Sequence, residues 1–193
     1  MIDNTITEIS SYHLAVQPDL GETQKTNAGK FIVMGLDNLT DPVTGKLIPN
    51  ASDILKQSIF SFQVPSFSQQ PIEIRTGNTV IKSAGTPTFS NSTVSLHDYV
   101  GMETYNVLYA WQALSYNYKT KRVGLMSDYK KTAYMLEYTT DFSKVVRVWK
   151  LYGVFITSLA KDDFDVSANA NEVKIRCDLS YDWAEPQDPN QIF

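Results

Sequence analysis

The sequence predicts a mainly β protein, a β-sandwich or barrel with one flanking α-helix. Apolar and polar side chains alternate strictly through residues 172–183, which is the period of a half-buried strand. Only residues 102–118 carry apolar side chains at helical spacing. Shorter apolar runs with the length of strands are found at 31–36, 59–64, 133–138, 145–151 and 154–159.

The chain divides into three parts. Residues 1–28 are polar and show no clear period, which predicts an N-terminal arm that becomes ordered on contact with a partner. Residues 29–186 form the β domain, and residues 187–193 form a C-terminal tail. Within the domain, residues 37–57 are rich in Asp, Asn, Pro and Gly and predict a long loop, with a short helix from about Ser52 to Gln57.

A hairpin is predicted in the first half of the domain. The strands Pro71–Arg75 and Thr79–Lys82 flank Thr76-Gly77-Asn78, where Gly and Asn tolerate a positive φ. A further strand is expected over 88–97, with its apolar side chains on one face. Later in the chain, Gly153 separates the two strands expected at 145–151 and 154–159.

The helical segment has two expected core anchors, Trp111 and Leu114, which would pack against a sheet. Asp98 is expected to cap this helix or to lie near its N-terminus as an early acidic residue. In the final strand the expected buried face consists of Val173, Ile175, Cys177, Leu179, Tyr181 and Trp183. Cys177 belongs to this series, so it is expected to be a small core residue rather than a nucleophile.

Composition argues against an enzyme. The chain has one Cys and two His, which excludes an intrachain disulfide and any site with several thiolates, and no cofactor or metal is expected. His97 and Asp98 are adjacent in a strand and are expected to point to opposite faces, so they are poorly placed to form a catalytic dyad. The acidic run at 163–167 begins like a calcium loop but has Ala168 and Lys174 where glycine and glutamate are needed.

The net charge of −4 hides an uneven distribution. Residues 119–150 hold eight basic and three acidic side chains, a balance of +5, and residues 161–193 hold three basic and eight acidic ones, a balance of −5. Two interpretations remain open at this point. The segments are either ordinary solvated faces or complementary edges that meet between subunits.

The order of six segments resembles the tail tube protein of contractile-tailed bacteriophages and, more distantly, the type VI secretion tube protein. The segments are FIVMGL, SIFSFQVPSF, QPIEIRTGNTVIKSAG, TVSLHDYVGMETYNVLYAW, YKKTAYMLEYTTDFSKVVRVWKLYGVFITSL and NEVKIRCDLSYDWAEP. The resemblance covers roughly residues 29–186, and it rests on order and spacing rather than on a single motif.

The resemblance implies a virion subunit. Six copies would form a ring, inner strands would join into one barrel around a lumen, and rings would stack into a tube that conducts DNA during ejection. Sheath and baseplate proteins would be partners in a tail that is assembled in the cytoplasm of a bacterial host. The ring-stacking hairpin would consist of Ile72, Glu73, Ile74, Arg75, Thr76, Gly77, Asn78 and Thr79.

Other functions stay open from the sequence. A tube initiator, a tube terminator or a secreted tube protein would share the fold, and the long loop at 37–57 and the long N-terminal arm depart from short family members. A lipocalin-like binder would be a monomer with a ligand-sized cavity. The N-terminus lacks the pattern of a signal peptide, and no apolar run is long enough to span a membrane.

Overall fold

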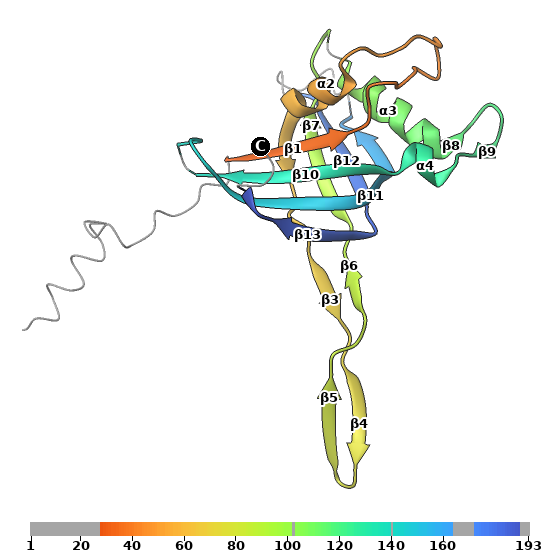
Figure 1. The fold of residues 1–193 in the computed structure, drawn as a ribbon. Helices are drawn as coiled ribbons and strands as arrows, with labels where there is room; N and C mark the ends of the chain where they lie inside the picture. The colour runs from red at the N-terminus through yellow and green to blue at the C-terminus, as the bar shows by residue number, and fades with distance from the viewer. Residues whose placement is uncertain (1–27, 102, 140, 164–171, 190–193) are drawn as a thin grey trace, which may run out of the picture.

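The computed structural model describes residues 28–101, 103–139, 141–163 and 172–189 of the 193-residue chain. The predicted N-terminal arm, apart from Ala28, lies outside the described residues, and so does the end of the predicted C-terminal tail. The elements in Figure 1 are β1 (Gly29–Met34), α2 (Ala51–Ser58), β2 (Ile59–Phe62), β3 (Phe67–Gln69), β4 (Ile72–Thr76), β5 (Thr79–Ser83), β6 (Pro87–Phe89), β7 (Ser92–His97), α3 (Thr104–Ser115), β8 (Tyr116–Asn117), β9 (Arg122–Val123), α4 (Met126–Tyr129), β10 (Lys131–Tyr138), β11 (Val145–Lys161), β12 (Lys174–Ser180) and β13 (Trp183–Gln187).

Two antiparallel sheets share the long strand β11 (Figure 1). Sheet 1 has the order β1-β10-β11-β13, and sheet 2 has the order β11-β12-β7-β2. Residues 145–154 of β11 pair with β10, and residues 155–161 pair with β12. Among the described residues the strand order runs linearly from β1 to β2 and does not close. The prediction of a mainly β fold with a flanking helix is confirmed, as a sandwich rather than a closed barrel.

A glycine lets β11 pass from one sheet to the other. Gly153 has a φ of 67°, in the left-handed region, and a Cβ at this position would lie 2.7 Å from Cγ of Asp182. Asp182 also accepts a hydrogen bond from Nζ of Lys130 at 2.8 Å and donates its backbone N–H to the carbonyl of Tyr152. The prediction of separate strands at 145–151 and 154–159 is therefore wrong, because the chain bends at Gly153 without losing its pairing.

The bend where Gly153 packs against Asp182 also interrupts the final strand. Burial alternates as predicted from Ile175 to Tyr181, but the chain bends at Asp182 between β12 and β13. The bend shifts the alternation by one residue, so that Ala184 is buried and Trp183 is 49% exposed. The predicted burial of Trp183 is wrong for this reason.

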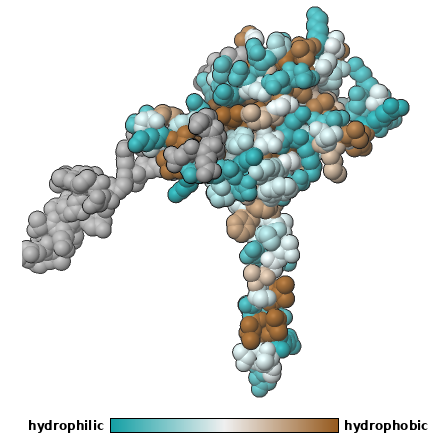
Figure 2. All heavy atoms as spheres, in the orientation of Figure 1, coloured by the Kyte–Doolittle hydropathy of each residue, from teal (hydrophilic) through white to brown (hydrophobic). Residues whose placement is uncertain are grey.

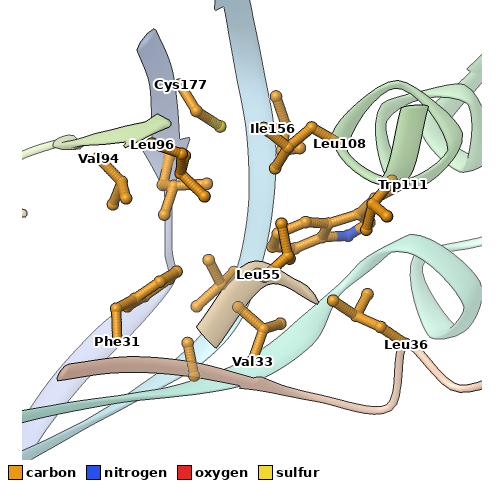
Figure 3. Packing of buried hydrophobic residues seen from close by; sticks show 14 of the residues in the cluster. Phe31, Val33, Leu36, Leu55, Val94, Leu96, Leu108, Trp111, Ile156 and Cys177 are labelled. Carbon is orange, nitrogen blue, oxygen red and sulfur yellow. The ribbon is translucent and has the colours of Figure 1, made fainter. Parts of the chain in front are cut away.

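Helix α3 closes one end of the sandwich. Trp111 is 1% exposed, lies in the core shown in Figure 3, and donates its Nε1–H to the carbonyl of Tyr129 at 2.9 Å. Leu114 is partly buried against the same core. The predicted capping role of Asp98 is wrong, since Glu103 precedes the first turn of α3 and Asp98 instead forms an ion pair with Lys161.

The core lies between the two sheets and is covered by α2 and α3. Figure 3 shows side chains from both sheets and both helices converging on it. The labelled members are Phe31, Val33, Leu36, Leu55, Val94, Leu96, Leu108, Trp111, Ile156 and Cys177. No helix in the described part of the chain has the length and apolar character needed to cross a lipid bilayer.

A narrow two-stranded ribbon, residues 67–89, projects from this body (Figure 1). It consists of β3 paired with β6 and, further out, β4 paired with β5. We call it the β-arm. The strand predicted over 88–97 is divided into β6 and β7, because the chain leaves the arm at Phe89 and enters sheet 2 at Ser92. The helix α2 and the loop at 37–50 lie at the opposite end of the molecule from the arm (Figure 1).

Candidate assembly surfaces

The outer part of the β-arm exposes an apolar face. Ile74 lies opposite Ile81 in the β4–β5 register, and Ile72 is two residues from Ile74, so the three side chains share one face. Their exposed fractions are 55% for Ile72, 52% for Ile74 and 54% for Ile81. Figure 2 shows this apolar surface as a brown patch on the arm. Exposed apolar surface of this kind is typical of sites of protein contact.

The other face of the arm, which we call the polar face, carries three charged side chains and Val80, which is 46% exposed. Glu73 pairs with Lys82 at 3.7 Å, and Arg75 lies opposite Val80. Gly77 has a φ of 62° at the tip, as the predicted turn requires. The eight residues predicted to stack rings are all exposed on this hairpin: Ile72, Glu73, Ile74, Arg75, Thr76, Gly77, Asn78 and Thr79.

Aromatic contacts join the arm to the body. The rings of Phe67 and Phe89 lie 5.8 Å apart across the β3–β6 pair, and Phe89 lies 5.9 Å from Tyr181 at the end of β12. Tyr181 is 7% exposed and belongs to the core. The arm is therefore a continuation of sheet 2 that is held at its base by packed rings.

The outer face of sheet 2, which points away from the core, is polar in its middle, and at one end of it Lys174 lies level with His97 beside the exposed ring of Phe60. Arg176 lies level with Ser95, and Asp178 lies level with Thr93, whose hydroxyl donates to the Asp178 carboxylate at 2.8 Å. On the neighbouring strand β11, Ala160 lies level with Arg176 and Ser158 lies level with Asp178. The sequence alternation predicted which side chains point outward, but not that these three strands place them side by side.

Sheet 2 has an open edge on each side. Within the described residues, β2 pairs only with β7, and the part of β11 from Phe155 to Lys161 pairs only with β12. Open edges present unpaired backbone N–H and C=O groups, which invite pairing with another chain. The sheet is therefore able to extend in both directions.

The two residues that superficially suggest catalysis have separate partners. Nδ1 of His97 lies 3.3 Å from Oε2 of Glu172, and Oδ2 of Asp98 lies 2.5 Å from Nζ of Lys161. The His97 ring also packs edge-on against Phe60, with 5.0 Å between the centroids. The described residues contain no group of three His, Cys, Asp or Glu side chains placed to bind a metal ion.

Cys177 is a core residue, as the alternation predicted. It is 1% exposed, and burial raises the pKa of its thiol to about 12. The thiol is therefore neutral at physiological pH, and we expect a maleimide to leave the native protein unlabelled at about pH 8 and to label it fully in guanidinium. Rapid labelling of the native protein would contradict this placement.

The basic and acidic segments meet in part within one subunit. Lys130, from the basic segment, forms its ion pair with Asp182 of the acidic segment at 2.8 Å. Lys119 and Lys121 are exposed in the turn between β8 and β9, where Nζ of Lys119 donates to the carbonyl of Pro42 at 3.2 Å, and Arg122 is exposed on β9. Only the charges that the fold leaves at the surface are available for the complementary contact between subunits that the sequence left open.

Comparisons with known proteins agree with the geometry. No protein-family model matches the sequence, and no curated protein sequence matches it. Among solved structures, the anti-feeding prophage cap, a tube terminating cap, has 19% identity and a TM-score of 0.61 over 90% of this chain and 96% of its own. The sheath/tube terminator of the PVC extracellular contractile injection system has 18% identity and a TM-score of 0.61 over 88% of this chain and 99% of its own.

A chain from the PVC sheath–tube complex is similar at 19% identity and a TM-score of 0.57, over 92% of this chain and 97% of its own. At these identities the likeness concerns the fold, and the aligned lengths show that the fold is shared almost from end to end. The chain therefore has the tail-tube-like fold found in the tube and tube-terminator assemblies of contractile injection systems.

Proposed function

We propose that this chain is a structural, non-enzymatic subunit whose copies form hexameric rings that stack into the tube of a contractile tail. The observation that supports this most directly is sheet 2, which combines two open edges with a polar outer face and continues into the β-arm. Pairing of β2 in one copy with β11 in the next would extend the sheet around a ring and remove both open edges. The outer face of sheet 2 would then line the lumen.

The proposed lumen suits the passage of a polyanion. In the middle of this face Arg176 and Asp178 carry opposite charges, small neutral side chains lie level with them on β7 and β11, and Lys174 is next to Arg176 along β12. A lining without concentrated positive charge would let DNA slide without holding it. We accordingly infer a conduit for DNA ejection in a virion tail assembled in the cytoplasm of a bacterial host, with sheath and baseplate proteins as partners.

A tube terminator is a second candidate. Two of the structures with a TM-score of 0.61 are tube terminators, and this chain covers 96% and 99% of their lengths. A terminator needs to stack at one end only, whereas a tube subunit must stack at both. Tubes of unlimited length from the purified protein would favour the tube subunit, and single or paired rings would favour the terminator.

Electron microscopy and light scattering test the proposal directly. The purified full chain should form rings with sixfold symmetry, or tubes of such rings, as the protein concentration rises. If only monomers are found across a wide range of salt and protein concentrations, the proposed function is wrong.

The polar face of the arm offers a variant test. Arg75→Glu combined with Asn78→Trp should shorten or abolish tubes and leave the free energy of unfolding within about 0.5 kcal/mol of the wild-type value, because both side chains are exposed. Arg122→Glu, on exposed β9, is the matched control. If the double variant forms tubes of wild-type length, the arm does not take part in the stacking contact.

A further inference from the structure

Three apolar side chains are buried on the side of sheet 1 that faces away from the core. Leu136 and Val148 are each 1% exposed and lie level with each other on β10 and β11. Ala28 is 3% exposed, and its carbonyl accepts from the Tyr138 N–H at 2.8 Å, which continues the pairing of β1 with β10. These three differ from the other buried apolar side chains of the described residues, all of which belong to the core. We call them the outer strip.

The register of sheet 1 places the outer strip opposite the core. Met135 belongs to the core, so its neighbour Leu136 points to the other side, and Trp149 packs against the core, so Val148 does the same. Met34 shares this outer face by the alternation of β1 and is 54% exposed. An uncovered sheet face leaves apolar side chains exposed in this way. The outer strip therefore has a cover that Met34 lacks.

The described elements do not account for this cover. The buried apolar side chains of α2 and α3 belong to the core on the other side of the sheet. In the turn between β10 and β11, the ring of Phe142 lies 5.9 Å from that of Tyr138, but Phe142 is itself 48% exposed. A further segment of chain is needed to bury Leu136 and Val148 together.

The end of β13 lies beside the outer strip. Gln187, the last residue of β13, lies level with Val148, and Pro189 is no longer in the extended conformation. Proline cannot donate to a strand ladder, so the chain leaves the sheet edge at this point. The outer strip begins next to Gln187 and runs across β11 and β10 to β1. A chain that crosses the strands from β13 would follow this path.

We propose that residues 190–193 cross the outer face of sheet 1 in their own subunit and cover the outer strip with Ile192 and Phe193. These are the two large apolar side chains that follow β13. The six residues after Gln187 reach up to about 20 Å, and the three strand spacings from β13 to β1 amount to about 14 Å. Burial of the apolar side chains on both partners would drive the contact.

The covered strip gives sheet 1 a different role from sheet 2. With its own chain over this end of the face, sheet 1 offers no apolar strip to a second copy, and contacts between copies are left to the edges of sheet 2 and the β-arm. This inference goes beyond the proposed function and does not depend on it, because the tail would dock within one subunit whether or not rings form.

Thiol labelling of the full chain measures the cover. Val148→Cys places a small thiol in the outer strip, and Met34→Cys is the matched control on the uncovered part of the same face. The native Cys177 adds no background because it is buried. We expect a maleimide to label Val148→Cys at least about tenfold more slowly than Met34→Cys, because the covered thiol reacts only after local opening. Equal labelling rates would contradict the inference.

Substitutions in the tail identify the segment that forms the cover. Ile192→Asp combined with Phe193→Asp should raise the labelling rate of Val148→Cys close to that of the exposed control. Asn190→Asp combined with Gln191→Asp adds the same charge but keeps both apolar side chains, so it should leave labelling slow. If the first pair of substitutions leaves the labelling of Val148→Cys unchanged, residues 190–193 do not cover the strip and the inference is wrong.

Crosslinking tests the contact directly. Gln191→Cys combined with Val148→Cys keeps both apolar tail residues and should form a disulfide within the monomer on mild oxidation of a dilute solution. Ile9→Cys combined with Val148→Cys tests residues 1–27 as the cover in the same way. Disulfide-linked dimers of the first variant would assign the cover to a second copy, and a link in the second variant alone would assign it to the N-terminal segment. Either result would overturn the inference, whereas failure of the wild type to form rings would overturn only the proposed function.

Discussion

Trp111→Ala should lower the free energy of unfolding by about 3–5 kcal/mol, which is the range for removing a large aromatic side chain from a core. Trp111 is 1% exposed and packs where α3 meets the sheets (Figure 3). The substitution would also leave the Tyr129 carbonyl without the hydrogen bond it now accepts from the indole at 2.9 Å. Chemical denaturation followed by far-UV circular dichroism measures the change.

Trp183→Ala is the matched control for this prediction. Trp183 is 49% exposed, and its ring stacks on that of Tyr152 with 4.9 Å between the centroids. Its removal should therefore change the free energy of unfolding by no more than about 1.5 kcal/mol. If the two substitutions have equal effects, the assignment of α3 to the core is wrong.

Gly153→Ala should be the second strongly destabilising substitution. The positive φ of 67° alone makes a residue with a Cβ less favourable by about 1–2 kcal/mol, and the new Cβ would collide with the Asp182 side chain. Displacing Asp182 would also disturb its ion pair with Lys130. We expect a total loss above about 2 kcal/mol, measured by chemical denaturation.

Gly77→Ala separates these two causes. Gly77 has a similar φ of 62°, but among the described residues, its two chain neighbours aside, no atom lies within 4 Å of the position its Cβ would take. It should therefore show the backbone effect alone. In the Gly153→Ala background, Asp182→Ala should recover part of the lost stability, because it removes the atoms that collide. If the two glycine substitutions lower the free energy of unfolding equally, the contact between residue 153 and Asp182 has no steric effect on stability.

Local patterns in the sequence predicted most elements. The alternation around Cys177 identified β12 and its buried face, and the Thr76-Gly77-Asn78 sequence identified the β4–β5 hairpin. Periodicity failed where tertiary contacts redirect the chain. Gly153 does not end a strand because Asp182, which lies between β12 and β13 of the same subunit, supports the bend. That contact joins residues distant in sequence.

The assembly surfaces were only partly visible in the sequence. The hairpin residues could be identified, but their exposure depends on the short β3–β6 pair that carries the hairpin away from the body. The outer face of sheet 2 depends on the register between β7, β11 and β12, which no local pattern encodes. The order of the loop at residues 37–50 rests on the hydrogen bonds of Asp41, in a segment whose composition indicated only a loop.

The membership of β11 in both sheets bears on how the subunit responds to load. Its first part is bonded to β10 and β13, and its second part to β12, so neither sheet can peel away without breaking backbone bonds of the same strand. We therefore expect little local opening at the junction and cooperative unfolding of the two halves of the sandwich as one unit. Tension applied at the arm would pass through sheet 2 into β11 and be shared by the whole domain instead of being concentrated in one layer.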